Sequence, residues 1–443
     1  MPLTSDADDP VTRLSTAPPA QAPTDDRPRR GLLSALEIDL RVFGMVIALA
    51  VILIGFGFVT DGRFLRPVNM VNLAVQSVSV AIIATGMTMV IVSRNIDLSV
   101  GSIAGVVGMT YAVLMARILP DYMGFDHPLL WIVALLAGLI LGATIGGVQG
   151  YIIAYIGVPS FVVTLGGLLI FRGATWLVTR GVTISPVDPS FRRLGGGPLG
   201  SVGGTASWVV GAVACAAIVA LLGYGRRQRM RFGFPLRPMW AEAVVGTFSC
   251  LAVLGLVWLF NSYKWPPALA ERHAAETGIA IPPGGLSAGI PWPVIVLLGV
   301  TLVMNFVATR RRFGRYVFAI GGNPEASELA GINTRWTIMK TFILIGLLCA
   351  ISSAVATARL DGATLDLGEG YELYVIAAAV IGGTSFAGGI GTISGAVMGA
   401  LVMSSLAYGL SFIGLSSPIQ DIVAGIVLII AVAFDTINRR RKV

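Results

Sequence analysis

The sequence predicts an all-α membrane protein, a polytopic helical bundle of about 10–12 transmembrane segments. Of its 443 residues, 55% are hydrophobic and only 12% are charged, and the mean hydropathy is +0.82. A water-soluble core cannot hide that much apolar surface. Roughly 20 apolar residues in a helix cross a bilayer core of about 30 Å. Continuous apolar blocks such as 42–59 and 336–358 recur along the chain, unlike the short alternating segments of a β-barrel.

Twelve apolar segments are candidate spans, and two positions complicate their number. Glycines 382, 383, 388 and 389 break the tenth segment, and a Gly-Val-Pro-Ser sequence at 157–160 divides the fourth from the fifth. Either break is compatible with a re-entrant or discontinuous helix, which would lower the count to ten or eleven. The segments are 42–59, 72–92, 100–118, 129–156, 161–178, 206–224, 240–260, 292–308, 336–358, 373–390, 392–414 and 419–435.

The distribution of Lys and Arg predicts the orientation. Five lie in the N-terminal tail, five in 225–239, five in 308–335 and four near the C-terminus. Loops rich in Lys and Arg stay on the cytoplasmic side, so both termini are expected inside the cell. The net charge of +8 is therefore mostly topological, and nucleic-acid binding is a poor interpretation of these short clusters.

The chain divides into two tails and one membrane domain. Residues 1–41 are polar and rich in Pro and Asp, without the apolar core of a cleavable signal peptide, and are predicted to form a disordered cytoplasmic tail. The transmembrane domain is expected over 42–436, with an extracytoplasmic loop at 261–291 and a cytoplasmic loop at 308–335. Residues 437–443 form a basic cytoplasmic tail.

Two glycine-containing stretches, 96–105 and 390–399, are weakly alike. Gly101 aligns with Gly395, and Gly105 with Gly399. An internal repeat is one explanation. The other is that small residues four apart let helices pack closely.

Few residues are suited to bond chemistry. The three cysteines lie inside predicted spans without metal-ligand spacing, and the two histidines lie in predicted loops. No Gly-x-x-x-x-Gly-Lys-Ser/Thr pattern for nucleotide phosphates occurs. We therefore expect no metal, no cofactor and no catalytic centre, and any ATP would be bound by another chain.

Polar residues at two positions are candidates for lining a path through the membrane. Asn72 and Gln76 fall on one helical face, together with Asn69. They are suited to a hydroxyl-rich ligand or, equally, to bonds with neighbouring helices. Asn95, Asp97 and Ser99 interrupt the apolar sequence just before the small residues Gly101 and Ser102. Such a break exposes side-chain oxygens and helix N-terminal amides together, although Asp97 or Ser99 could also serve only as a helix cap.

The cytoplasmic loop contains signals for a short surface helix. Asn323 is suited to the N-cap, Pro324 to the first helical position, and Gly331 to the far end, while Glu325 complements the positive end of the helix. A bare connection between spans would not need such an element. We therefore expect the helix to contact a cytosolic partner.

Several ordered motifs resemble the permease subunits of bacterial carbohydrate ABC importers of the ribose, arabinose and xylose group. They are GMTMVIV at 86–92, IDLSVGS at 96–102, VPSFVVTL at 158–165, FRG at 171–173, AIGGNPEA at 319–326, GIN at 331–333 and VIGGTSFAGG at 380–389. Two further features are similar to the xylose branch of this family: the basic loop GRRQRMR at 225–231 and the apolar segment at 240–260.

The resemblance implies a permease domain in the inner membrane that performs no bond chemistry and translocates a monosaccharide. The two features shared with the xylose branch imply that this sugar is D-xylose. It implies a homodimer of permeases, a cytosolic ATPase and an extracytoplasmic sugar-binding protein. Asn72, Gln76, Asn95, Asp97, Ser99, Gly101 and Ser102 would line the path. The coupling segment would consist of Gly322, Asn323, Pro324, Glu325, Ala326 and Gly331.

Alternatives of other kinds remain open at this stage. Ribose, arabinose or galactose could be the sugar of the same kind of importer. An ion-coupled secondary sugar transporter would also have many spans, but it would carry carboxylates within the membrane, which are scarce here. A membrane enzyme would need a converging set of reactive side chains, which the spans lack.

Overall fold

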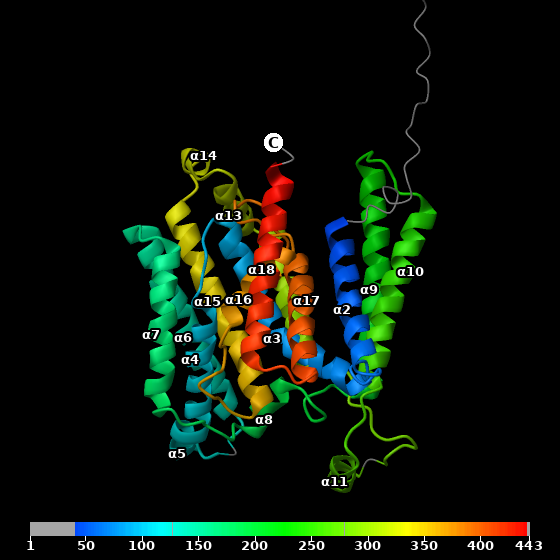
Figure 1. Cartoon of the computed structure of the whole chain (residues 1–443). Helices are drawn as coiled ribbons and strands as arrows, with labels where there is room; N and C mark the ends of the chain where they lie inside the picture. The colour runs from blue at the N-terminus through cyan, green and yellow to red at the C-terminus, as the bar shows by residue number, and fades with distance from the viewer. Residues whose placement is uncertain (1–39, 126, 279, 441–443) are drawn as a thin grey trace, which may run out of the picture.

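The protein is a bundle of long helices that run roughly parallel to one another (Figure 1). A computed structural model describes residues 40–125, 127–278 and 280–440. Within these residues, ten helices are long and apolar enough to cross a membrane, and the remaining regular structure is the C-terminal helix α18, several short helices and three isolated β-bridges. The predicted polytopic all-α class is confirmed. The predicted tail at 1–41 lies outside the described residues except for the last two, which belong to the first helix.

The ten long helical segments follow the predicted spans. They are α2 (Leu40–Val59), α3 (Pro67–Val92), α4 to α5 (Val100–Met123), α6 with its last turn (Leu130–Ile156), α7 (Ser160–Thr179), α9 (Gly204–Arg231), α10 (Met239–Asn261), α12 (Trp292–Arg310), α15 (Thr334–Leu360) and α17 (Ile393–Phe412). The shorter ones are α8 (Pro189–Arg192), α11 (Pro267–Thr277), α13 (Arg312–Gly322), α14 (Pro324–Leu329) and α16 (Tyr371–Ile381). The last helix, α18 (Ser417–Arg440), continues into the predicted C-terminal tail.

Figure 1 shows α13 and α14 at one end of the bundle and α5, α8 and α11 at the opposite end. We call these ends the α14 face and the α11 face. The predicted loop at 261–291 carries α11 and lies at the α11 face, whereas the loop at 308–335 carries α13 and α14. The two loops are therefore on opposite sides of the bundle.

Helices α3 and α15 form the centre of the bundle. In the apolar part of α3, 94% of the residues are buried, and 78% are buried in α15. In α9 and α10 the share is only 11% each, and Figure 1 shows these two helices as a hairpin at the flank. Because α9 and α10 are apolar on nearly all sides, their exposed side chains are suited to contact with lipid.

The two predicted breaks differ in kind. The chain at 157–159 is a simple turn between α6 and α7, with Gly157 in the left-handed region at φ +87°. The tenth segment is truly shortened, because α16 has only 11 residues and ends at Ile381, before the glycine-rich loop. Non-helical stretches at 93–99 and 361–370 precede α4 and α16.

The glycines that suggested an internal repeat have close packing in common. A Cβ at Gly101 would collide with the Gly368 carbonyl, and one at Gly399 with the Ala378 carbonyl. Both glycines thus lie against α16 or the segment before it. Close helix approach accounts for their spacing.

Glycines also bring α6 against α15 backbone to backbone. A Cβ at Gly146 would meet the Phe342 carbonyl and the Ile343 Cα, and Gly142 and Gly346 approach each other in the same way. Backbone atoms cannot rotate aside as a side chain can, so the spacing of these helices depends on the absence of side chains at these positions.

We predict that Gly146→Ala destabilises the protein although alanine favours helix formation. Overpacking typically costs about 1–3 kcal/mol, which exceeds the roughly 1 kcal/mol that alanine contributes over glycine in a helix. The matched control is Gly147→Ala, whose methyl group would come no closer than 3.5 Å, to Ile343 Cγ1. Thermal unfolding of the purified proteins in detergent should show a lower midpoint for Gly146→Ala only; equal midpoints would contradict the packing argument.

Candidate functional site

The seven predicted path residues do not gather in one place. The structure distributes them among a hollow at the α11 face, a buried cluster before α4, and a small gap beside α16. Asn95 belongs to none of these, because its side-chain amide donates to the Ser93 carbonyl at 2.9 Å and to the Ser93 hydroxyl at 3.1 Å. It stabilises a local turn.

The first group, Asn72 and Gln76, lies at an open hollow of about 590 Å³ at the α11 face. Asn72 of α3 lies on its wall, and Gln76 accepts a hydrogen bond from Arg359 of α15 at 3.5 Å. Arg192, Arg193 and Tyr263 join Arg359 in the lining. The volume falls in the usual range for small-molecule sites, and the donors and acceptors suit hydroxyl groups.

The second group is a closed polar cluster. Asp97 and Ser99 are completely buried, and Asp97 Oδ1 accepts from the Ser99 amide at 2.8 Å and from the Ser99 hydroxyl at 2.6 Å. The Gln149 side-chain amide of α6 donates to the Ser99 hydroxyl at 2.9 Å. These contacts agree with a structural role at the start of α4, but Asp97 Oδ2 is buried without a hydrogen-bond partner among the described residues.

The third group is too confined for a sugar. Gly101 and Ser102 line a gap of about 10 Å³, enough for at most one water molecule. Arg172 and Glu369 form an ion pair at its edge, and Glu372 also borders it. This gap joins α4, α7 and the segment before α16.

The predicted coupling segment forms the expected short helix. The Asn323 side chain accepts a hydrogen bond from the Ala326 amide at 3.0 Å, and Pro324 occupies the first turn of α14. Gly331 adopts φ +79° just beyond the helix. Glu325 is exposed, and Glu328 accepts from the Thr334 hydroxyl at 2.6 Å, which ties α14 to the start of α15.

The side chain of Leu329 is 91% exposed at the end of α14. Sequence reasoning missed it, although a leucine in an otherwise polar surface helix is a visible signal. An isolated apolar side chain that protrudes from a capped helix is suited to insertion into a pocket of another protein.

Arg94 fixes the other end of this segment. Its guanidinium donates to the carbonyls of Gly321 and Gly322, both at 2.8 Å, and so caps the C-terminal end of α13. The Gly389 amide donates to the Val92 carbonyl at 3.0 Å, so the glycine-rich loop after α16 meets the same junction. Arg94 is the residue before Asn95, and it therefore connects the coupling segment directly to the chain that leads into the buried Asp97 cluster.

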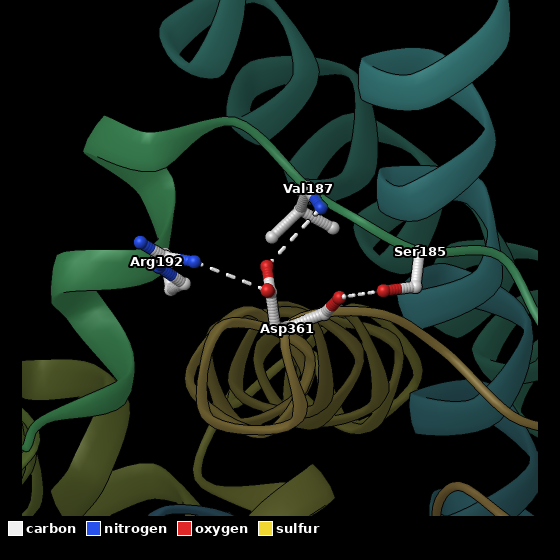
Figure 2. Close-up of polar contacts among 4 residues, drawn as sticks. All are labelled: Ser185, Val187, Arg192 and Asp361. Atoms are coloured by element: carbon white, nitrogen blue, oxygen red, sulfur yellow. Dashed lines mark hydrogen bonds and ion pairs between the residues drawn. The ribbon is translucent and has the colours of Figure 1, made fainter.

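A second junction lies at the other end of α15 (Figure 2). Asp361 Oδ2 pairs with Arg192 at 3.2 Å, and Oδ1 accepts from the Val187 amide at 3.3 Å. The Asp361 carbonyl accepts from the Ser185 hydroxyl at 2.7 Å. One residue at the end of α15 thus clamps the segment that contributes Arg192 and Arg193 to the hollow.

We predict that Asp361→Asn loosens this segment without unfolding the protein. Asparagine tolerates the left-handed conformation at φ +51°, but it loses the charge that attracts Arg192 and strengthens the bond to Val187. Hydrogen exchange followed by mass spectrometry should show faster exchange over 185–193. The matched control is Asp366→Asn, an exposed carboxylate in the same connection. Equal exchange in both variants would show that the clamp does not hold the segment.

Comparison with known proteins identifies relatives over almost the whole chain. Residues 69–432 match the family described as branched-chain amino acid transport system / permease component. The xylose transport system permease protein XylH of Escherichia coli K12 is 38% identical over 418 residues, covering 94% of this chain and 97% of that protein. The Haemophilus influenzae protein of the same name is 36% identical, covering 91% and 98%. The ribose import permease RbsC of E. coli K12 is 32% identical, covering 83% and 85%. No solved structure matches.

Proposed function

Because this chain belongs to the branched-chain amino acid transport system / permease component family, we propose that it is the permease subunit of an ATP-driven sugar importer in the inner membrane. We propose D-xylose as the sugar. The observation that carries this proposal is the 38% identity to a xylose permease over nearly the full length of both proteins. The ribose relative matches less of the chain at lower identity.

The proposed orientation places the α14 face in the cytoplasm. Arginines cluster in the connection between α9 and α10 and in the loop that carries α13 and α14, and such clusters stay inside the cell. The α11 face, with its hollow, would then be extracytoplasmic. There it would receive a sugar from a binding protein.

We propose that a cytosolic ATPase docks on α14. The exposed Leu329 offers an apolar anchor, and Asn323, Pro324 and Gly331 fix the shape of the segment that presents it. Arg94 carries displacement of Gly321 and Gly322 to the 93–99 segment. Since an ABC importer works by alternating between inward- and outward-open states, this contact supports Arg94 as the link between the ATPase and the membrane interior.

The proposed route for the sugar begins among Asn72, Gln76 and Arg359 at the α11 face. The Asp97 cluster and the gap at Gly101 and Ser102 are closed in this conformation, so they would need to open during transport. We propose that two copies of the chain assemble around one ATPase dimer.

Uptake of labelled xylose into proteoliposomes tests this function. The vesicles should contain this chain, its cognate ATPase and its binding protein, with ATP on the ATPase side. We expect uptake that requires all three proteins and ATP and that excess xylose suppresses more strongly than ribose, arabinose or galactose. Stronger competition by another sugar would change the substrate, and uptake by this chain alone without ATP would indicate a secondary transporter.

We predict that Leu329→Asp weakens binding of the ATPase. Removing an anchor residue that carries much of the binding energy of an interface costs about 2 kcal/mol, or roughly 30-fold in affinity. Phe234→Asp is the control, because Phe234 is another strongly exposed apolar residue, in the connection between α9 and α10. Affinity measured by surface plasmon resonance in detergent should fall for Leu329→Asp only; equal affinities would remove Leu329 from the interface.

A further inference from the structure

Two adjoining hollows meet where α12 turns into α13. The first, of about 640 Å³, is open to solvent and contains four arginines and no acidic residue in its described lining. The second, of about 240 Å³, is almost entirely apolar. Both are bordered by Val307 and Phe313, so they form one continuous surface with a basic end and an apolar end. Neither hollow contains a residue assigned above to the path or to coupling.

The basic end consists of Arg310, Arg311, Arg312 and Arg315. Arg311 lies over the Phe306 ring, with its guanidinium carbon 4.9 Å from the ring centre. The guanidinium groups of Arg312 and Arg315 are exposed on the first turn of α13. Guanidinium groups match the oxygens of a phosphate through paired hydrogen bonds, so this end is suited to a phosphate anion.

The apolar end is a furrow between the α12–α13 corner and α15. Ile343, Leu344 and Leu347 form its α15 side, and Lys340 stands at its upper limit. Successive turns of α15 extend the furrow away from the arginines and along the bundle, which is the direction an acyl chain takes in a bilayer.

The level of these hollows agrees with a headgroup and its chain. Arg310 is the last residue of the membrane-length helix α12. Trp336 is partly exposed one turn before Lys340, whose ammonium lies 4.7 Å from the Trp336 ring centre. Tryptophan and lysine at a helix end are typical of the interface between lipid and water. The arginines therefore lie at headgroup depth, and the furrow lies below them.

We propose that this surface binds one anionic phospholipid of the phosphatidylglycerol type. Its phosphate contacts Arg312 and Arg315, and one acyl chain occupies the furrow between Val307 and Leu347. The orientation rule explains why arginines accumulate on this side of the membrane, but not why they border an apolar furrow. An acidic protein surface would pair with the arginines but would leave the apolar furrow empty. A phospholipid fills both ends of the surface, so a lipid is the occupant that these two hollows favour. The proposal does not depend on which solute the protein transports.

The test is a titration of purified full-length protein in detergent with dioleoyl phosphatidylglycerol, followed by native mass spectrometry. Dioleoyl phosphatidylcholine serves as the neutral lipid. Each juxtamembrane arginine increases the affinity for an anionic lipid surface about fivefold. The double substitution Arg312→Gln with Arg315→Gln should therefore weaken the affinity for phosphatidylglycerol roughly 30-fold. The matched control is Arg227→Gln with Arg231→Gln, which removes two exposed arginines from the end of α9 on the same side.

Further measurements separate a lipid site from other anion binding. Leu347→Trp fills the furrow without changing the charge, and it should also weaken phosphatidylglycerol binding, whether or not the arginine variant folds. Inorganic phosphate should compete only weakly, because it has no chain for the furrow. Equal loss in both arginine pairs, or an unchanged affinity in Leu347→Trp, would overturn the proposal in favour of simple charge attraction. If the variant with Arg312→Gln and Arg315→Gln lost binding of the ATPase but kept its affinity for phosphatidylglycerol, the arginines would instead form a protein contact, and the proposal would be overturned.

Discussion

The fold depends on satisfying backbone groups where helices are interrupted. Lipid offers no hydrogen bonds, so a non-helical segment at membrane depth must find its partners within the protein. The segment 93–99 finds them in α7, where the Ser160 hydroxyl accepts from the Ile96 amide at 3.2 Å and the Thr164 hydroxyl donates to the Ile96 carbonyl at 3.4 Å. Packing of this segment against α7 is therefore a requirement of the fold.

The second interruption mirrors the first. The segment 361–370 pairs with the chain beyond α7, with two hydrogen bonds of 2.9 and 3.0 Å between Ile184 and Ala363. Both interruptions follow a long buried helix, and both contain an aliphatic-Asp-Leu sequence, at 96–98 and 365–367. Since α3 ends at the α14 face and α15 at the α11 face, the two units run in opposite directions. Such opposed units are typical of transport proteins with inverted repeats.

Sequence reasoning succeeded where the cause is local. Spans are predicted because apolar length is set by the bilayer, and α14 is predicted because Asn323, Pro324 and Gly331 act on neighbouring backbone groups. Contacts between distant segments could not be derived in this way. Arg94 meets Gly321 across 227 positions, and the arginines of the hollow at the α11 face come from the segment around α8 and from the far end of α15. The comparison of 96–105 with 390–399 followed glycine spacing, whereas the structural counterpart of the first interruption is the segment before α16.

Helix α15 connects the coupling segment with the hollow at the α11 face. It begins directly after the turn that follows α14, and it ends at the Asp361 clamp beside the hollow. Its contact with α6 runs through glycine backbones, which leave no flexible side chains to absorb a shift. A displacement at α14 must therefore move α6 and α15 together or bend α15. Bending α15 would cost more free energy than moving the two helices together, because α15 carries no proline and remains a continuous helix to Leu360. The joint movement would reach the α11 face through Asp361.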